Sequence, residues 1–336
     1  MLPLQGLPPR YTARPIDPSA DLADVLDLCV AVAMHEYGSP DVDERMIREA
    51  WNLPSMEIGR DTMFVLDAES RPAALAEYYD GEAEHVAPFL FFRVRPDLAD
   101  GAVADAALNW GVVRGRRNLP LAVPGARVAL VTGVASVNTG TIAALERNGW
   151  QRDRINWTME VDLAVADLPP PDWPPGIELR TADLEADAPA IHAVESDAFS
   201  DHYGYLAQPY DEWLHFRTRF MRAEPDLWFL AMDGDEIAGM ALCSSQRVGQ
   251  PDLGWVSTLG VRRPWRKRGL GLAILRHAFR ELAARGKPRA GLGVDSQSLT
   301  GATRLYEKAG MRVVRQHFDY ETVLRQGRDL RTVSLG

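Results

Sequence analysis

The most informative segment of this sequence is Val261-Arg262-Arg263-Pro264-Trp265-Arg266-Lys267-Arg268-Gly269-Leu270-Gly271. It follows an apolar run, Gly254 to Val261, and precedes a helical pattern, so it is typical of a turn between a strand and a helix. Glycines let a backbone approach a ligand closely and take positive φ angles. The first N–H groups of a helix lack internal partners, and the helix dipole favours an anion there.

Five cations lie within residues 262–268, although the whole chain has a formal net charge of -10. A solvated basic turn is the plainer interpretation, but here cations, glycines and a helix start coincide. The segment therefore predicts a diphosphate site. It is not a P-loop, because no GxxxxGK[ST] occurs, and Gly269-x-Gly271 lacks the third glycine of a dinucleotide fingerprint.

The sequence after this turn predicts further alternating elements. Apolar residues at helical spacing indicate a helix from Leu270 to Arg285, which Gly286 ends. A short strand, a helix closed by Gly310 and a last strand are expected at Gly291–Asp295, Thr300–Lys308 and His317–Leu324. We therefore predict an α/β class with a mixed sheet (an α+β arrangement) and helices on its faces.

The two halves of the chain carry matching landmarks in the same order, which indicates an internal duplication. Each half begins with an arginine, an Asp-Leu pair and a helical pattern, and each continues with a hairpin signal. The matched positions, at offsets between 161 and 167 residues, are Arg14 and Arg180, Asp61 and Asp226, Val94 and Val261, and Ala144 and Leu305.

A proline-rich segment lies near the midpoint of the chain. Five prolines between Asp167 and Gly176 remove backbone donors and favour extended geometry, so no helix or central strand is expected there. We predict a first domain over residues 1–166, a semi-rigid linker over 167–176 and a second domain over 177–336.

Composition excludes several classes of protein. The chain has 336 residues, of which 46% are hydrophobic, and a pI near 5.3, which disfavours nucleic acid and anionic membranes as partners. Cys29 and Cys243 fall in apolar runs, and no Cys/His cluster has zinc spacing, so we expect buried thiols and no metal. Neither a secretory signal nor a transmembrane run is recognisable, so the cytoplasm is the expected location.

Two motifs resemble the GCN5-related N-acetyltransferase (GNAT) family. One is Arg266-x-x-Gly269-x-Gly271 after an apolar strand, and the other runs from Val294-Asp295 through Gly301 to Met311. The resemblance covers roughly residues 177–325. The first half resembles a degenerate copy, so the chain is similar to tandem-domain bacterial acetyltransferases of the mycothiol synthase type.

The resemblance implies acetyl-CoA as the acyl donor, with its thioester in a splay between the strands Gly254–Val261 and Gly291–Asp295. Backbone groups of Leu259, Gly260 and Val261 would pair with the pantetheine arm, and a bulge in that strand could direct an N–H at the thioester carbonyl. The same resemblance makes Tyr306 the proton donor to the leaving thiolate. It assigns the remaining cofactor contacts to Arg266, Lys267, Arg268, Gly269, Leu270, Gly271 and Ser298.

This sequence departs from the family pattern at two places. Many relatives carry a glutamate on the strand before the phosphate loop, but Trp255–Thr258 contains no carboxylate, and Ser298 stands where the family often has asparagine. Asp295 is either a base or the cap of the following turn. Four further residues form either an acidic acceptor pocket or a solvated helix face: Glu195, Asp197, Asp201 and His202.

The first half lacks the chemical groups of the second. The corresponding loop, Val94 to Val103, has lost the later arginines and gained Asp97 and Asp100, which would repel a diphosphate. Leu145 takes the place of Tyr306. We predict that this half does not bind acyl-CoA productively.

The leading functional hypothesis is therefore an acetyl-CoA-dependent N-acetyltransferase, with a small-molecule amine as acceptor. Three alternatives stay open: a mycothiol synthase-like acetyltransferase, a protein acetyltransferase and a CoA-binding protein without turnover. The sequence leaves the acceptor, the general base, the acyl chain preference and the oligomeric state open, a homodimer included.

Overall fold

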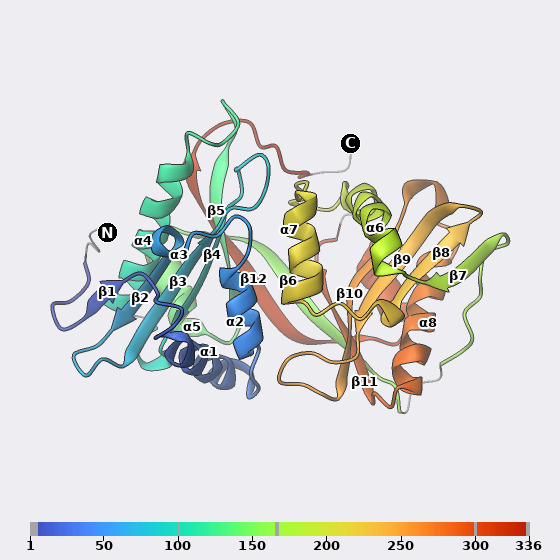
Figure 1. Cartoon of the computed structure of the whole chain (residues 1–336), viewed down its shortest axis with the longest axis horizontal. Coiled ribbons are helices and arrows are strands. Elements are labelled where there is room, and N and C mark those ends of the chain that lie inside the picture. Colours follow the sequence, from blue (N-terminus) through green and yellow to red (C-terminus); the bar gives the residue numbers. More distant parts are fainter. Residues whose placement is uncertain (1–5, 100, 165–167, 299–300, 334–336) are drawn as a thin grey trace. The chain divides into compact units, whose positions relative to one another are not determined.

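The computed structural model describes residues 6–99, 101–164, 168–298 and 301–333 and divides the chain into two compact units (Figure 1). The first unit comprises Met1–Ile155 with His317–Leu330, and the second comprises Asn156–Gln316 with Arg331–Gly336. The chain therefore exchanges strand segments between its halves. Residues 156–162 pair within the second unit and residues 317–325 pair within the first.

This exchange shifts the unit boundaries away from those expected at residues 166 and 177. Asp167 lies outside the described residues, and residues 168–174 form neither helix nor strand, as their prolines predict. Leu168 and Trp173 pack against the core of the second unit. The proline-rich segment is therefore part of the second unit's packing and does not mark its start.

The second unit contains a six-stranded sheet in the order β7-β8-β9-β10-β11-β6. Neighbouring strands are antiparallel except for β10 and β11, which are parallel. The helix after the basic turn, the short strand and the next helix confirm three of the expected elements, except that Thr300 lies outside the described residues. The last expected strand, His317–Leu324, forms but pairs in the first unit. The bounds of the strands and helices of the second unit are β6 Gln151–Asp162, β7 Ile177–Thr181, β8 Trp228–Asp233, β9 Glu236–Ser244, β10 Leu253–Val261, β11 Arg289–Asp295, α6 Leu184–Phe199, α7 Tyr210–His215, α8 Leu270–Ala284 and α9 Ala302–Lys308.

Helices cover both faces of this sheet, and the alternation along β8 shows which face is which. Trp228 and Leu230 join the apolar cluster of α6 and α7, whereas Phe229 and Ala231 join the cluster of α8. One face of the sheet therefore belongs to α6 and α7 and the other to α8.

The first unit repeats this topology. Its sheet runs β1-β2-β3-β4-β5-β12, with β4 and β5 as the parallel pair. Each strand occupies the place of its counterpart in the second unit, which supports the internal duplication. The bounds are β1 Thr12–Arg14, β2 Thr62–Leu66, β3 Pro72–Tyr79, β4 Phe89–Val94, β5 Val128–Ala135, β12 Arg312–Arg325, α1 Leu22–Tyr37, α2 Glu44–Trp51, α3 Ile58–Asp61, α4 Ala102–Asn118 and α5 Thr139–Arg147.

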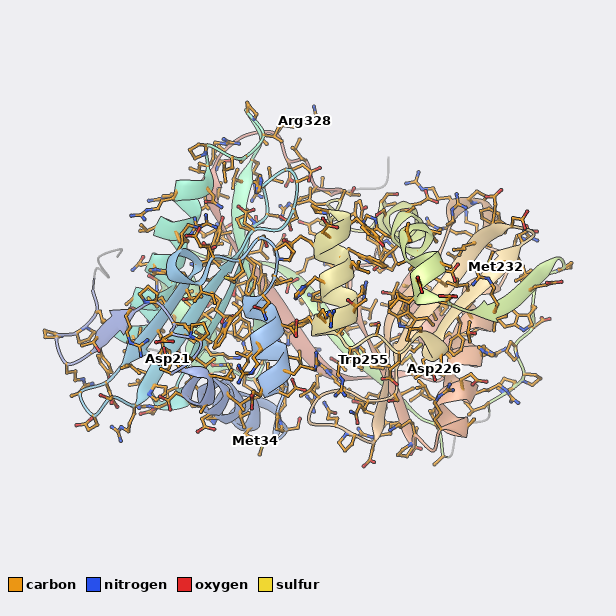
Figure 2. The ribbon with its side chains drawn as sticks, in the orientation of Figure 1. Asp21, Met34, Asp226, Met232, Trp255 and Arg328 are labelled. Atoms are coloured by element: carbon orange, nitrogen blue, oxygen red, sulfur yellow. The ribbon has the colours of Figure 1, made fainter. Side chains whose placement is uncertain are left out.

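An arginine–aspartate pair recurs at the start of both units and sharpens the alignment between them. Arg14 binds the carboxylate of Asp21, a residue labelled in Figure 2, and Arg180 binds Asp187 at 2.6 and 2.8 Å. Both partners lie seven residues after their arginine. The structural equivalent of Asp21 is therefore Asp187, whereas the Asp-Leu pair at 183–184 marks only the start of α6.

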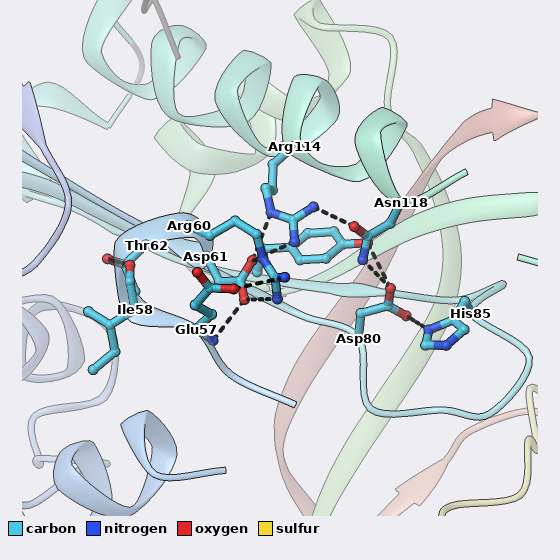
Figure 3. A network of polar contacts seen from close by, with 10 residues as sticks. Glu57, Ile58, Arg60, Asp61, Thr62, Asp80, His85, Arg114 and Asn118 are labelled. Atoms are coloured by element: carbon cyan, nitrogen blue, oxygen red, sulfur yellow. Dashed lines mark hydrogen bonds and ion pairs between the residues drawn. The ribbon is translucent and has the colours of Figure 1, made fainter. Parts of the chain in front are cut away.

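A buried charge network holds the first unit together (Figure 3). Arg114 of α4 is 1% exposed and donates from Nε to Asp61 Oδ1 at 2.7 Å. Arg60 binds the same carboxylate, and Arg114 also donates to Asn118, which in turn donates to Asp80. Buried charges are stable only when paired and hydrogen-bonded, and the buried pair of Arg114 and Asp61 meets that condition.

Candidate functional site

Strands β10 and β11 separate partway along their length. They pair in parallel from Leu253 with Arg289 to Val256 with Leu292. Beyond Val256, no further residue of β10 pairs with β11 within these fully described strands. At the same point the register of β10 against β9 shifts between Val256 and Thr258. A β-bulge therefore lies at Ser257, where the two parallel strands part.

The bulge also reverses which side chains of β10 face each helix layer. Val256 packs in the cluster of α8, and Gly254 lies beneath Leu282 of that helix. In a regular strand Thr258 would face the same way, because residues i and i+2 share a face. Thr258 instead contacts Glu195 of α6, and a Cβ on Gly260 would lie 3.2 Å from the Cβ of Ala198 in α6.

The turn after β10 has the backbone conformation that the glycines predicted. Lys267 has φ 62° and Gly269 has φ 85°, and α8 begins at Leu270 without a side-chain cap. A Cβ on Gly271 would lie 3.0 Å from Leu305, so glycine there permits close packing of α8 against α9. The first N–H groups of α8 therefore have no side-chain acceptor and are oriented toward the turn.

Arg266 does not project from this turn into solvent. Its Nε donates to the carbonyl of Val261 at 2.9 Å, one terminal nitrogen donates to the carbonyl of Ala198 at 2.9 Å, and both terminal nitrogens bind the Asp201 carboxylate. The side chain therefore ties the turn to the end of α6. Its contacts therefore support the loop.

The other cations of the turn divide into two groups. Arg262 is engaged by Asp197 at 2.7 Å and by Glu236 at 3.2 Å. Arg263, Lys267 and Arg268 are exposed, although Arg263 approaches Asp201 at 3.4 Å and Arg268 approaches the Pro175 carbonyl at 3.4 Å. The exposed group supplies the positive charge in front of α8.

Tyr306 lies on α9 and is 7% exposed. It packs in the apolar cluster of α8, β10 and β11. Burial raises the pKa of Tyr306 to about 12, so the phenol stays protonated at neutral pH. Its position in the fold is thus compatible with a proton donor, and its ring also contributes to the packing of this cluster.

The turn after β11 places Asp295 and Ser298 together. Asp295 Oδ1 accepts a hydrogen bond from the Gln297 N–H at 2.8 Å, and the Ser298 N–H donates to the Asp295 carbonyl at 3.0 Å. Asp295 therefore caps its turn, which was one of the two roles expected for it.

The four candidate residues at the end of α6 serve different purposes. Asp197 and Asp201 bind arginines of the basic turn, and Asp197 is also exposed to solvent. Burial would raise the pKa of Asp201, but the hydrogen bond and charge of Arg266 outweigh it and lower that pKa. For His202 burial has the opposite effect and lowers the pKa, and the centroid of its ring lies 4.5 Å from that of Phe199.

Glu195 lies apart from this group, beside the bulge. It accepts hydrogen bonds from Trp213 Nε1 at 2.8 Å, from Thr258 at 3.3 Å and from Arg217. Sequence reasoning did not find Trp213, Arg217 or Thr258. A helical segment rich in arginine and aromatic residues, Tyr210 to Phe220, was the signal that could have drawn attention to them.

The corresponding turn of the first unit has a different conformation. Arg95 is held by Asp67 at 3.2 Å and Asp97 at 2.8 Å, and Gly101 precedes α4 with φ -107°. Leu145, which replaces Tyr306, is fully buried, and Asp100 lies outside the described residues. The positive φ glycine and the exposed cations of the second unit have no counterpart among the described residues of this turn.

The described part of the chain contains no cluster of three or more His, Cys, Asp or Glu side chains suited to a metal ion. Both cysteines, Cys29 and Cys243, are buried and free. None of the helices among the described residues has the length and apolar character needed to cross a bilayer.

Comparisons with known proteins agree with this geometry. Residues 188–311 match the model of the acetyltransferase (GNAT) family. The mycothiol acetyltransferase of Acidothermus cellulolyticus is 32% identical over 197 residues, covering 55% of this chain and 58% of that protein. That of Salinispora arenicola is 32% identical over 182 residues, covering 52% and 56%. The chain thus spans little more than half the length of these curated relatives.

Solved structures extend the likeness over both units. A GCN5-related N-acetyltransferase from Sphaerobacter thermophilus has a TM-score of 0.77 and 28% identity, covering 98% of this chain and all of that one. A tandem GNAT protein from the clavulanic acid biosynthesis pathway has a TM-score of 0.68 at 15% identity, covering 94% and 99%, which shows a shared fold. The sequence match to the acetyltransferase (GNAT) family model thus lies in the second half of this chain.

Proposed function

We propose that the second unit transfers an acetyl group from acetyl-CoA to the amine of a small molecule. The separation of β10 and β11 at the Ser257 bulge carries this proposal. It leaves one backbone edge of β10 available beyond Val256, and the same strand leads directly into the basic turn and the start of α8. A long ligand with an amide-containing arm and a diphosphate fits these two features in that order.

The residues of the site fit coenzyme A as follows. Backbone groups of Leu259, Gly260 and Val261 would pair with the pantetheine arm along the free edge of β10. The N–H groups of Gly269, Leu270 and Gly271 would bind the diphosphate, with the charges of Lys267 and Arg268 beside them. Arg266 acts by holding this turn against α6, and the Ser298 hydroxyl supplies a further cofactor contact.

Transfer requires that a neutral amine nitrogen attack the thioester carbonyl carbon. A C–N bond forms, the C–S bond breaks, and the proton released by the amine finally resides on the thiol sulfur. A backbone N–H at the bulge would stabilise the developing oxyanion.

Tyr306 would act on the leaving sulfur. Because a thiol has a pKa of about 8.5 and Tyr306 one of about 12, a hydrogen bond from the phenol to the thiolate is favoured over complete proton transfer. Tyr306 then stabilises the leaving thiolate until solvent relays to it the proton released by the amine.

A second candidate is mycothiol acetyltransferase activity, which the two 32% identical relatives favour. In either case we propose a cytoplasmic protein that acts on a small molecule. The first unit would be a degenerate GNAT-like domain that does not bind acetyl-CoA, because the turn before α4 lacks exposed cations and holds Arg95 with carboxylates.

The decisive assay follows CoA release from acetyl-CoA over a panel of amines, with the mycothiol precursor included, in the wild type and in Tyr306→Phe. We expect transfer to at least one amine and a large loss in the variant. CoA binding without transfer to any acceptor would contradict the enzymatic proposal. Calorimetry should find one CoA per chain, and two would overturn the assignment of the first unit.

A further inference from the structure

A charged pair lies at the point where β10 leaves β11. Glu195 extends from α6, and Arg217 lies in a π-helical segment, Phe216–Phe220, that directly follows α7. Arg217 and Thr258 both donate to Glu195 Oε1, while Trp213 Nε1 donates to Oε2 at 2.8 Å. Since Thr258 is the first residue after the bulge, this pair adjoins the proposed reaction centre.

The two oxygens of Glu195 are held in different ways. Oε2 is bound by Trp213, whose side chain is buried, so this contact fixes the carboxylate to α7. Oε1 is shared between Arg217 and the Thr258 hydroxyl on the side of β10. Glu195 can therefore lose its contact with Arg217 and still keep its position.

Arg217 has hydrogen-bonding capacity left over. Its side chain is 12% exposed, and its Nε is buried without a hydrogen-bond partner. A guanidinium carries five donors, and leaving a buried donor unsatisfied is costly. The residue also lies in a π-helix, a conformation that is rare and frequent at functional sites. These features are typical of an arginine that binds a ligand.

We propose that the acceptor amine also carries an anionic group, a carboxylate in the simplest case. This zwitterion binds between Glu195 and Arg217 and replaces their direct contact. The ammonium group binds Glu195 Oε1 beside the bulge, and the carboxylate binds Arg217, which recognises carboxylates in bidentate geometry. Both protein charges stay compensated, so the exchange avoids the penalty of leaving either of these largely buried side chains as an unpaired charge.

This inference rests on the proposed acetyl transfer and narrows its acceptor class. The test compares matched acceptors that differ only in the anionic group: amino acids and dipeptides against their C-terminal amides. In the wild type we expect kcat/KM to favour the acids by at least about 10-fold.

Arg217→Gln should abolish that preference, raising KM for the acids by about 30-fold or more and leaving the amides little changed. Arg217→Lys should restore part of the preference. Arg219→Gln, which removes an equal charge from an exposed position of the same segment, should leave the preference intact.

A wild type that favours the amides, or an Arg217→Gln variant that loses acids and amides equally, would overturn the inference. Acetyl-CoA affinity by calorimetry reports whether each variant is folded. A second experiment measures by calorimetry how tightly acids and amides bind to the complex of the protein with CoA. Binding of acids alone, without transfer, would support the anion site while contradicting the transferase proposal, whereas equal binding would overturn the anion site.

Discussion

Arg266 and Asp201 form a two-point contact in which both terminal nitrogens of the guanidinium bind the carboxylate, one of them at 3.2 Å. Asp201 is 5% exposed and follows α6, whereas Arg266 lies in the turn before α8. Arg266 is therefore a structural link between these two elements. The family resemblance led us to expect a cofactor contact from it.

Replacing either partner of this contact should weaken acetyl-CoA binding indirectly. Asp201→Asn and Arg266→Gln should each lower the free energy of unfolding by about 1–3 kcal/mol, because each leaves a buried polar group unsatisfied. The double variant should be no less stable than the worse single one, since the two residues share one interaction. Chemical denaturation measures the stability and calorimetry the affinity. Additive losses would contradict the link.

The same contact predicts an acid limit to stability. The pKa of Asp201 is lowered from its ordinary value of 3.8, so the folded state binds this proton more weakly than the unfolded chain does. The stability that this carboxylate contributes is fully present above pH 3.8 and is lost as the pH falls through the lower pKa that Asp201 has in the folded protein. Denaturation curves of wild type and Asp201→Asn, recorded between about pH 2 and pH 6, should converge at the acid end.

The exposed cations should govern affinity for the cofactor without affecting stability. Lys267→Gln combined with Arg268→Gln should raise KM for acetyl-CoA by about 3–10-fold, with a smaller effect at high salt because exposed charges are screened. A matched control is Arg116→Gln with Arg117→Gln, two exposed residues at the end of α4 in the first unit. Equal effects from both pairs would indicate a general charge effect and not a site.

Tyr306→Phe isolates the hydroxyl from the packing of the ring. The ring keeps its place in the apolar cluster, so the melting temperature should hardly change, whereas kcat should fall by about 100-fold. Because the pKa of Tyr306 is about 12, any alkaline loss of activity below that pH should arise from another group and persist in the variant. An unchanged kcat would assign Tyr306 to packing alone.

The network of Figure 3 should dominate the stability of the first unit. Asp61→Asn removes the charge facing Arg114 and Arg60 and should destabilise the protein by about 3–5 kcal/mol, since a buried cation is left uncompensated. Replacing Asp61 and Arg114 together by Leu and Met should cost less. Denaturant unfolding of the three proteins distinguishes these outcomes, and a greater loss in the double variant would contradict the pairing argument.

Local patterns predicted much of this molecule. The strand before the basic turn, the helix after it and the left-handed glycine between them follow from spacing and from the glycines themselves. The inward orientation of Arg266 could not be predicted, because it depends on Asp201, a residue 65 positions earlier in the chain. The same limit applies to Glu195 and Arg217, which only the packing of α6 against the segment after α7 brings together.

The strand exchange escaped prediction for a related reason. The landmarks of the duplication identified equivalent segments, but equivalent sequences pair equally well within either half on local grounds. The pairing partner of each segment is seen only in the structure, where residues 156–162 pair with β11 and residues 317–325 pair with β5.

That exchange also sets the order in which the protein can mature on the ribosome. The sheet of the first unit lacks the partner of β5 until residues 317–325 have been synthesised, although almost all its other residues are translated first. Until then β5 presents an unpaired edge, the kind of surface on which nascent chains associate. A polypeptide severed in the proline-rich segment would leave that strand on the wrong fragment, so the two fragments should regain their native state only when refolded together.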